Sequence, residues 1–177
     1  MEISVLADSE LSAYGRNQID DVCDQAFGSI SGDKDNSFNY QWVLKNDWHV
    51  IVKLDGVITS HVGIVERIGT VDGKPVRLGG VGAVATLPNM QKKGLASAAM
   101  DMAAGFMQDS LKMDFGLLLC AIETEPFYRR LGWQEVTGPL VFDQPQGKVT
   151  FHELTMVLAC VKQDWPPGII DLRGLPW

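Results

Sequence analysis

The sequence predicts an α+β (mixed α/β) fold, in which a central, mostly antiparallel sheet is flanked by helices. Residues 48–86 contain three extended segments joined by two Asp-Gly turns, a pattern typical of an antiparallel meander. Helical periodicity precedes the meander at residues 9–27 and follows it at residues 88–112. The apolar run at residues 115–121 then predicts a buried strand, so antiparallel and parallel pairing are expected together.

The first part of the chain predicts a strand, a helix and a loop. Residues 3–7 predict the strand, and Asp8 or Ser9 is the expected N-cap of a helix that Gly28 ends. One stripe of this helix is apolar and is expected to be buried: Leu11, Ile19, Val22, Cys23 and Ala26. Residues 29–40 are polar and rich in Gly, Ser and Asp, which predicts either a plain surface loop or a lid over a site.

The third strand of the meander is unusually rich in glycine. The two Asp-Gly turns, at residues 55–56 and 72–73, set its position in the meander. Because glycine weakens a strand, Gly79, Gly80 and Gly82 predict a bulge or a close backbone approach. The sheet is therefore expected to be splayed at this bulge.

The second half of the chain predicts two helices, further strands and a tail. The helix at residues 88–112 has one apolar face: Leu95, Ala98, Ala99, Met102 and Phe106. A short helix in TEPFYRRLG ends at Gly132, and further strands are expected at residues 133–136 and 149–160. The tail from Trp165, with its three prolines and two glycines, predicts irregular structure.

Length, charge and cysteine content limit the classes of protein that fit. The 177 residues suit a single domain spanning residues 1–177. A net charge of −7 argues against nucleic acid as a partner. No apolar run is long enough to cross a membrane and the N-terminus has no signal-peptide pattern. The three separated cysteines fit reduced thiols, so we expect a cytoplasmic protein.

The stretch MQKKGLASAAM predicts an anion-binding loop. Lys92 and Lys93 lie where a helix is expected to begin, although the helix dipole disfavours cations there. A bound phosphate reverses this effect, because the first N–H groups of a helix have no partners within it and attract anions. Gly94 allows close approach of the backbone, Ala96 is small, and Gln91 adds donors. The alternative is a helix with unfavourably placed surface lysines.

Two motifs together resemble the GNAT superfamily of acyl-CoA-dependent N-acetyltransferases. The first, VATLPNMQKKGLA, contains the pattern Q/R-x-x-G-x-G/A. The second is PFYRRLGW, and the order of elements matches over nearly the whole chain. The resemblance implies a GNAT-like fold, acetyl-CoA as co-substrate and a homodimer. The cofactor-binding residues that it implies are Val84, Ala85, Thr86, Gln91, Lys92, Lys93, Gly94, Leu95, Ala96 and Phe127.

The chemistry of acetyl transfer assigns roles to several residues. The resemblance implies that backbone groups near Val84 and Thr86 polarise the thioester carbonyl, as an oxyanion hole does. It also implies that Tyr128 is the general acid for the leaving thiolate; the alternative is simple packing. The amine must lose a proton to a carboxylate, for which Glu123, Glu125 and the C-terminal carboxylate of Trp177 are candidates.

A second likeness, to aminoglycoside 2'-N-acetyltransferases, rests on scattered positions. These are the stretch from His61 to Gly80, the Gly-Pro pair at residues 138–139, Asp143 and the final Trp177. The candidate substrate residues are Asp143, Glu125 and Gly82. The chain has Ala121 where GNAT proteins often have asparagine, and Gly82 where the aminoglycoside enzymes have glutamate.

The predicted function is transfer of an acetyl group from acetyl-CoA to a primary amine by direct attack in a ternary complex. The acidic charge favours a small cationic amine, such as an aminoglycoside or a polyamine. The alternatives are acetylation of a protein amine and a non-catalytic acyl-CoA sensor. His49, His61 and His152 are scattered through the sequence without a ligand motif, so structural roles and no metal site are expected.

Overall fold

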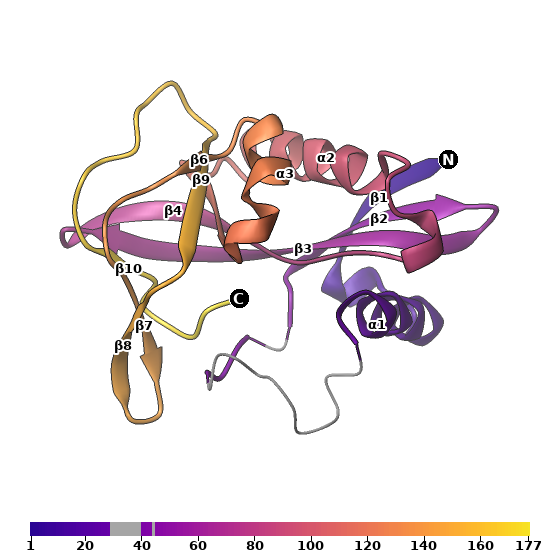
Figure 1. The fold of residues 1–177 in the computed structure, drawn as a ribbon, viewed down its shortest axis with the longest axis horizontal. Helices are drawn as coiled ribbons and strands as arrows, with labels where there is room; N and C mark the ends of the chain where they lie inside the picture. Colours follow the sequence, from indigo (N-terminus) through magenta and orange to yellow (C-terminus); the bar gives the residue numbers. More distant parts are fainter. Residues whose placement is uncertain (29–39, 44) are drawn as a thin grey trace. The chain divides into compact units, whose positions relative to one another are not determined.

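The computed structural model describes residues 1–28, 40–43 and 45–177 (Figure 1). The predicted loop or lid at residues 29–40 lies outside the described residues, except for Tyr40. Contacts divide the chain into two compact units. Unit 1 comprises Met1–Asn39, Lys45–Ile64 and Ala83–Ala103, and unit 2 comprises Tyr40–Leu44, Val65–Gly82 and Ala104–Trp177. The prediction of one domain over residues 1–177 stays a prediction.

Unit 1 combines antiparallel strands with helix α1. Its elements are β1 (Glu2–Ala7), the 3₁₀ turn η1 (Asp8–Glu10), α1 (Ala13–Phe27), β2 (Trp48–Leu54) and the 3₁₀ turn η2 (Pro88–Met90). Parts of β3 (Val57–Val71), β4 (Lys74–Thr86) and α2 (Leu95–Asp109) belong to it as well. Strand β2 pairs antiparallel with both β1 and β3.

Helix α1 buries the predicted stripe, but it begins later than predicted. Ile19 and Val22 pack in a core cluster with side chains of β2, β3 and β4, and Leu11, Cys23 and Ala26 are partly buried against it. Residues 8–10 form a separate 3₁₀ turn, so the N-cap is Ser12, whose Oγ accepts a hydrogen bond from the Gly15 N–H. The prediction of Asp8 or Ser9 as the cap was therefore wrong.

Unit 2 contains most of the sheet. Its elements are β5 (Phe115–Cys120), η3 (Ile122–Thr124), α3 (Glu125–Arg130), β6 (Gln134–Glu135), β7 (Leu140–Gln144), β8 (Gly147–Phe151), β9 (Leu154–Ala159) and β10 (Ile170–Asp171). With the shared strands, the order is β6-β9-β5-β4-β3-β10-β7-β8. The β4–β5 and β10–β7 pairs are parallel, whereas β5–β9, β6–β9, β7–β8 and β3–β10 are antiparallel. The predicted mixed, mostly antiparallel class is confirmed.

Three details of the later strands differ from the sequence prediction. Residues 149–160 form the end of β8 and then β9 rather than one strand, and β7 was not predicted. The tail is not wholly irregular, because β10 pairs with β3 and β7. Its prolines lie outside the two-residue strand, so no N–H that β10 needs is missing.

The two Asp-Gly turns of the meander are confirmed by their backbone angles. Asp55 and Gly56 have φ of 51° and 80°, and Asp72 and Gly73 have φ of 46° and 76°. Positive φ at both central positions is the type I′ hairpin geometry, whose twist matches that of the flanking strands. The first turn sets the pairing of β2 with β3 as far as Lys53, beyond which the register shifts, and the second turn joins β3 to β4.

The buried face of α2 is rotated relative to the predicted one. The buried residues are Leu95, Ala99, Met100, Ala103 and Met107, whereas Met102 is exposed. Gly79 of β4 explains why Met107 is among the buried residues. A Cβ on Gly79 would lie 2.3 Å from the sulfur of Met107, so only glycine leaves room for that side chain. The space that Gly79 leaves on β4 is therefore filled by Met107 and not by Phe106.

Candidate active site

The loop that contains Lys92 and Lys93, called the basic loop below, lies between β4 and α2 in unit 1. Helix α2 begins at Leu95, so Lys92 and Lys93 precede the helix, and the prediction of a helix starting near residue 88 was wrong. Both lysines are exposed, and Lys92 and Gly94 have positive φ of 61° and 80°. The loop thus turns sharply before the helix, and its lysines are exposed near the helix N-terminus, where an anion is favoured.

Side chains from β3 and the basic loop hold the last residues of β4. The Ser60 hydroxyl lies 2.9 Å from the Ala85 carbonyl oxygen, to which it donates, and 2.8 Å from the Thr86 hydroxyl. The Gln91 amide donates to the Thr86 carbonyl oxygen at 3.3 Å. Of the predicted acyl-binding residues, Ala85 and Thr86 are thereby fixed in place, and Val84 beside them is half-buried.

Tyr128 lies on α3 in unit 2 and is buried, as a proton donor shielded from water would be. Its ring makes edge-on contacts with Phe127 and Trp133, at centroid distances of 5.0 and 6.4 Å. Burial, helped by the nearby Cys120, raises the pKa of Tyr128 to about 12. The phenol therefore keeps its proton throughout the physiological pH range. Phe127 is half-buried beside it.

The two predicted glutamates differ in their surroundings. Glu123 is exposed in the turn η3, which follows β5 directly. Glu125 lies in the first turn of α3 and forms an ion pair with Arg129, one helical turn later. Glu125 is thus engaged within α3, and the role of either glutamate as proton acceptor stays a prediction.

Trp177 packs on the glycine-rich part of β4, within unit 2. A Cβ on Gly80 would lie 2.2 Å from the indole, and one on Gly82 would lie 3.2 Å from the main-chain carbonyl carbon of Trp177. The indole N–H donates to the Leu117 carbonyl oxygen at 3.2 Å, and the Arg67 guanidinium lies 5.2 Å from the ring centroid. The expected docking of the tail is confirmed, and the role of its carboxylate stays a prediction.

Asp143, a predicted substrate residue, lies on β7 and is paired within unit 2. Its carboxylate accepts from the Lys148 ammonium at 2.7 Å, and the same lysine bonds Asp171 at 2.9 Å. The β7–β8 hairpin therefore supplies the partner of Asp143 itself. Its predicted contact with substrate stays a prediction, as does that of Gly82.

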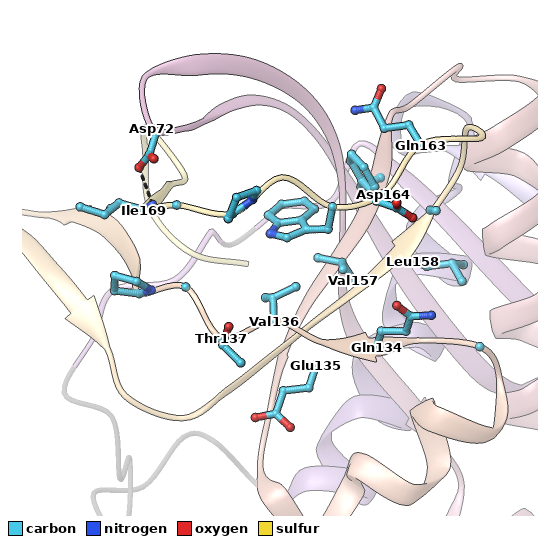
Figure 2. A pocket seen from close by; sticks show the side chains of 18 residues that line it. Asp72, Gln134, Glu135, Val136, Thr137, Val157, Leu158, Gln163, Asp164 and Ile169 are labelled. Carbon is cyan, nitrogen blue, oxygen red and sulfur yellow. Dashed lines mark hydrogen bonds between the residues drawn. The ribbon is translucent and has the colours of Figure 1, made fainter.

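A cavity of about 730 Å³ in unit 2 does not contain the predicted catalytic residues (Figure 2). It is lined by β6, β9 and residues 163–169 of the tail. Figure 2 shows Val136, Thr137 and Val157 around it, and the hydrogen bond from the Ile169 N–H to Asp72 at its border. Because Tyr128, Glu123 and Trp177 do not line it, we assign it no part in catalysis.

The structure brings together two histidines that the sequence prediction treated as scattered. The Nδ1 atom of His49 on β2 lies 3.0 Å from the Nε2 atom of His61 on β3, and both rings are buried. The two-residue turn at residues 55–56 alone would place residue 60 opposite residue 51, but a register shift between Val52 and Lys53 places residue 61 there. His49 is two positions from residue 51, so both histidines lie on one face of the sheet.

Neither a metal-binding cluster nor a membrane-spanning helix is found in the described residues. Within residues 1–28, 40–43 and 45–177, no group of three or more His, Cys, Asp or Glu side chains is arranged to hold a metal ion. In the same part of the chain, no helix has the length and apolar character needed to span a bilayer.

The fold and the loop together define a class of protein. A glycine-rich strand that leads through a basic loop into a helix N-terminus is an arrangement that favours phosphate binding. The family model of the acetyltransferase (GNAT) domain matches residues 9–136, and the chain belongs to this family. The match includes both sequence motifs, confirms the predicted GNAT membership and agrees with acetyl-CoA as the co-substrate. Comparison with curated protein sequences gives no match.

Solved structures with the same fold include bacterial GNAT proteins. A GNAT family acetyltransferase from Brucella melitensis, solved in complex with acetyl-CoA, has a TM-score of 0.62 and 15% identity, over 96% of this chain and 94% of that one. ElaA from Escherichia coli has a TM-score of 0.61 and 14% identity, over 88% and 97%. Eis1 from Mycobacterium abscessus has a TM-score of 0.57 and 16% identity, and the match covers 75% of this chain but only 31% of the Eis1 chain. At these identities the likeness is one of fold.

Proposed function

We propose that the protein transfers the acetyl group of acetyl-CoA to a small cationic primary amine, by direct attack in a ternary complex. The observation that carries this proposal is the GNAT match over residues 9–136, which includes both the basic loop and Tyr128. The basic loop supplies the phosphate-binding half of the function. Lys92 and Lys93 bind the pyrophosphate of coenzyme A, together with N–H groups at the start of α2.

The reaction needs a polarised thioester and a proton for the leaving sulfur. The amine lone pair attacks the thioester carbonyl carbon, the C–N bond forms, and the C–S bond breaks with its electron pair moving to sulfur. Backbone N–H groups of Val84–Thr86 stabilise the oxyanion that forms on the carbonyl oxygen. Tyr128 donates its phenolic proton to the sulfur, and the protonated state that burial imposes supports this role.

The amine proton leaves to a carboxylate, and we assign this role to Glu123. Its exposure, and its position immediately after the buried strand β5, support access to a soluble amine. The net charge of −7 supports a cationic acceptor, because the field of an acidic protein attracts cations. An aminoglycoside or a polyamine meets this requirement.

Release of coenzyme A from acetyl-CoA over a panel of amines tests the proposal. The panel contains aminoglycosides, polyamines and a lysine peptide, and it is run with wild type, Tyr128→Phe and the exposed-tyrosine control Tyr14→Phe. We expect turnover of the small cationic amines, with kcat lowered about 10²- to 10⁴-fold in Tyr128→Phe alone.

Each alternative outcome has a distinct meaning. Tight coenzyme A binding without turnover of any amine would identify a sensor. Turnover of the peptide alone would identify a protein acetyltransferase. Wild-type rates in Tyr128→Phe would remove the general-acid assignment.

A further inference from the structure

A row of hydrogen-bonded groups runs through unit 1 from Asp8 to the main chain of β4. Asp8 Oδ1 lies 3.3 Å from His49 Nε2, and His49 Nδ1 lies 3.0 Å from His61 Nε2. His61 Nδ1 in turn lies 3.0 Å from the carbonyl oxygen of Ala83. His61 is fully buried, and His49 and Asp8 are 5% and 7% exposed, so water does not compete for these contacts.

The acceptor at the end of the row fixes the protons of both rings. A carbonyl oxygen can only accept, so His61 must carry a hydrogen on Nδ1 to bond Ala83. Burial lowers the pKa of His61 to about 4, so the ring is neutral and its Nε2 is an acceptor. His49 must therefore donate from its own Nδ1. With Nδ1 donating, the neutral His49 ring presents a lone pair on Nε2 to Asp8, and only the cationic ring donates there as well.

The far end of the row is held by charged groups. The Arg16 guanidinium and the Lys45 ammonium both bind the Asp8 carboxylate, and they keep its pKa well below the usual range. Burial lowers the pKa of His49. The negative charges of Asp8 and of Asp20 on α1 act in the opposite direction, but burial outweighs them. Asp8 is thus ionised at the end of the row, and it accepts a hydrogen bond from His49 only when that ring is cationic.

The row acts on one peptide unit of β4. Ala83 has φ of 48°, a left-handed conformation that a residue with a Cβ adopts only when its surroundings enforce it. The Ala83 carbonyl and the Val84 N–H belong to the same planar trans peptide and point in opposite directions. A hydrogen bond that fixes the carbonyl therefore also fixes the direction of the Val84 N–H.

We propose that His49 and His61 are positioning residues that orient the Ala83–Val84 peptide, so that the Val84 N–H is aimed at the thioester carbonyl of acetyl-CoA. This inference rests on the proposed function, which uses backbone N–H groups of β4 to stabilise the oxyanion. The row does not carry the amine proton, because a peptide carbonyl oxygen cannot pass a proton onward. Its contribution is preorganisation of an oxyanion donor.

Nitrogen-15 NMR of the wild-type protein without ligand tests the row directly. We expect hydrogen on Nδ1 of both His49 and His61, and a coupling across the hydrogen bond between His61 Nδ1 and the Ala83 carbonyl carbon. A His61 ring with its hydrogen on Nε2, or the absence of this coupling, would overturn the proposal. This measurement requires neither turnover nor a variant that folds.

The effect on acetyl-CoA is tested by infrared spectroscopy with the thioester carbonyl labelled with carbon-13. Binding to wild type is expected to shift the carbonyl stretch to lower frequency. His61→Leu, which lacks the donor, is expected to lose this shift and to lower kcat up to about 10²-fold, with the KM for acetyl-CoA near its wild-type value. His61→Asn places an amide N–H near the position of Nδ1 and is expected to recover most of the shift. His152→Leu, at an exposed histidine, is the control.

The outcomes separate this inference from the proposed function. Acetyl-CoA that does not bind wild type would contradict the proposed function, whatever the NMR result. Binding without a shift in wild type, or an equal shift and kcat in wild type and His61→Leu, would contradict the positioning role alone. Loss of binding in His61→Leu with intact folding would also contradict it, since a positioning residue acts on the carbonyl and not on affinity.

Discussion

The segment from Ala83 in β4 to Gly94 before α2 has a left-handed backbone at both ends. Ala83 has φ of 48° in β4, and Lys92 and Gly94 have φ of 61° and 80° in the basic loop. Each such non-glycine residue costs on the order of 1–2 kcal/mol, so it persists only where its surroundings enforce it. The segment between them contains the backbone to which we assign the acyl group.

Replacing Lys92 and Lys93 together by alanine tests the basic loop. Each lysine offers about 1 kcal/mol to an exposed phosphate, so we expect coenzyme A to bind about thirtyfold more weakly in the double variant. The free energy of unfolding of the ligand-free protein should hold or rise slightly. Isothermal titration calorimetry at two salt concentrations measures both affinity and screening, with Lys162→Ala as the control. Equal affinities in wild type and the double variant would remove the lysines from the site.

Residue types could be predicted from the sequence where a motif has fixed spacing. Gln91, Gly94, Tyr128 and Trp133 are predicted in this way, because the family pattern spans a few neighbouring positions. The histidine row could not be found by spacing alone. His49 and His61 meet because a hairpin folds β2 onto β3, and Asp8 joins them from a different turn.

At the scale of elements, helix α1 shows how one side chain decides where a helix begins. The Ser12 hydroxyl accepts from the Gly15 N–H at 3.0 Å, whereas Ser9 lies in the preceding 3₁₀ turn. We expect Ser12→Ala to lower the free energy of unfolding by about 1 kcal/mol. Ser9→Ala, the matched control at the position suggested by the sequence, should change it by less than about 0.5 kcal/mol. Urea unfolding followed by circular dichroism measures both, and a larger loss in Ser9→Ala would contradict this assignment.

The glycines of β4 make room for the tail, which gives a second prediction at this scale. A Cβ on Gly80 would lie 2.2 Å from the Trp177 indole, so Gly80→Ala must displace the ring and should cost about 1–3 kcal/mol. A Cβ on Gly105 of α2 would meet no atom within 4 Å, and Gly105→Ala should stabilise by about 0.5–1 kcal/mol. Thermal unfolding and near-ultraviolet circular dichroism provide the comparison. Similar effects of the two substitutions would show that the indole does not occupy this space.

Elements with strong local signals were predictable, and elements formed by distant pairing were not. The Asp-Gly hairpins and the stripe of α1 follow from local sequence alone. Strand β10 has two residues in a proline-rich tail, and it exists because β3 and β7 supply its partners. The start of α2 was misplaced because Pro88 opens a 3₁₀ turn, which shares its sequence signal with a helix.

At the scale of the whole molecule, family membership accounts for the success of the fold prediction. The GNAT match covers residues 9–136, so the class of sheet, the co-substrate and the reaction type all follow from two motifs. The histidine row of unit 1 and the docked tail of unit 2 lie outside those motifs, and their contacts follow from the fold.

The buried histidine row should make the stability of the whole molecule depend on pH. Burial lowers the pKa of His61 from 6.5 to about 4 and lowers that of His49 too, despite the nearby Asp8. As the pH falls below 6.5, the histidines of the unfolded chain bind protons, whereas the buried rings of the folded protein stay neutral. The free energy of unfolding therefore falls until about pH 4. The expected loss from His61 is about 3 kcal/mol, and it is absent above pH 6.5.

His61→Asn isolates this contribution, because it keeps a hydrogen-bond donor for Ala83 but has no group that titrates in this interval. Urea unfolding of wild type and variant at closely spaced pH values should give curves whose difference changes between pH 6.5 and 4 and is constant above that interval. Carboxylates that titrate near pH 4 affect both proteins alike and cancel in the difference. Parallel curves would mean that the pKa of His61 is the same in the folded and unfolded protein, which would contradict its burial as a neutral ring.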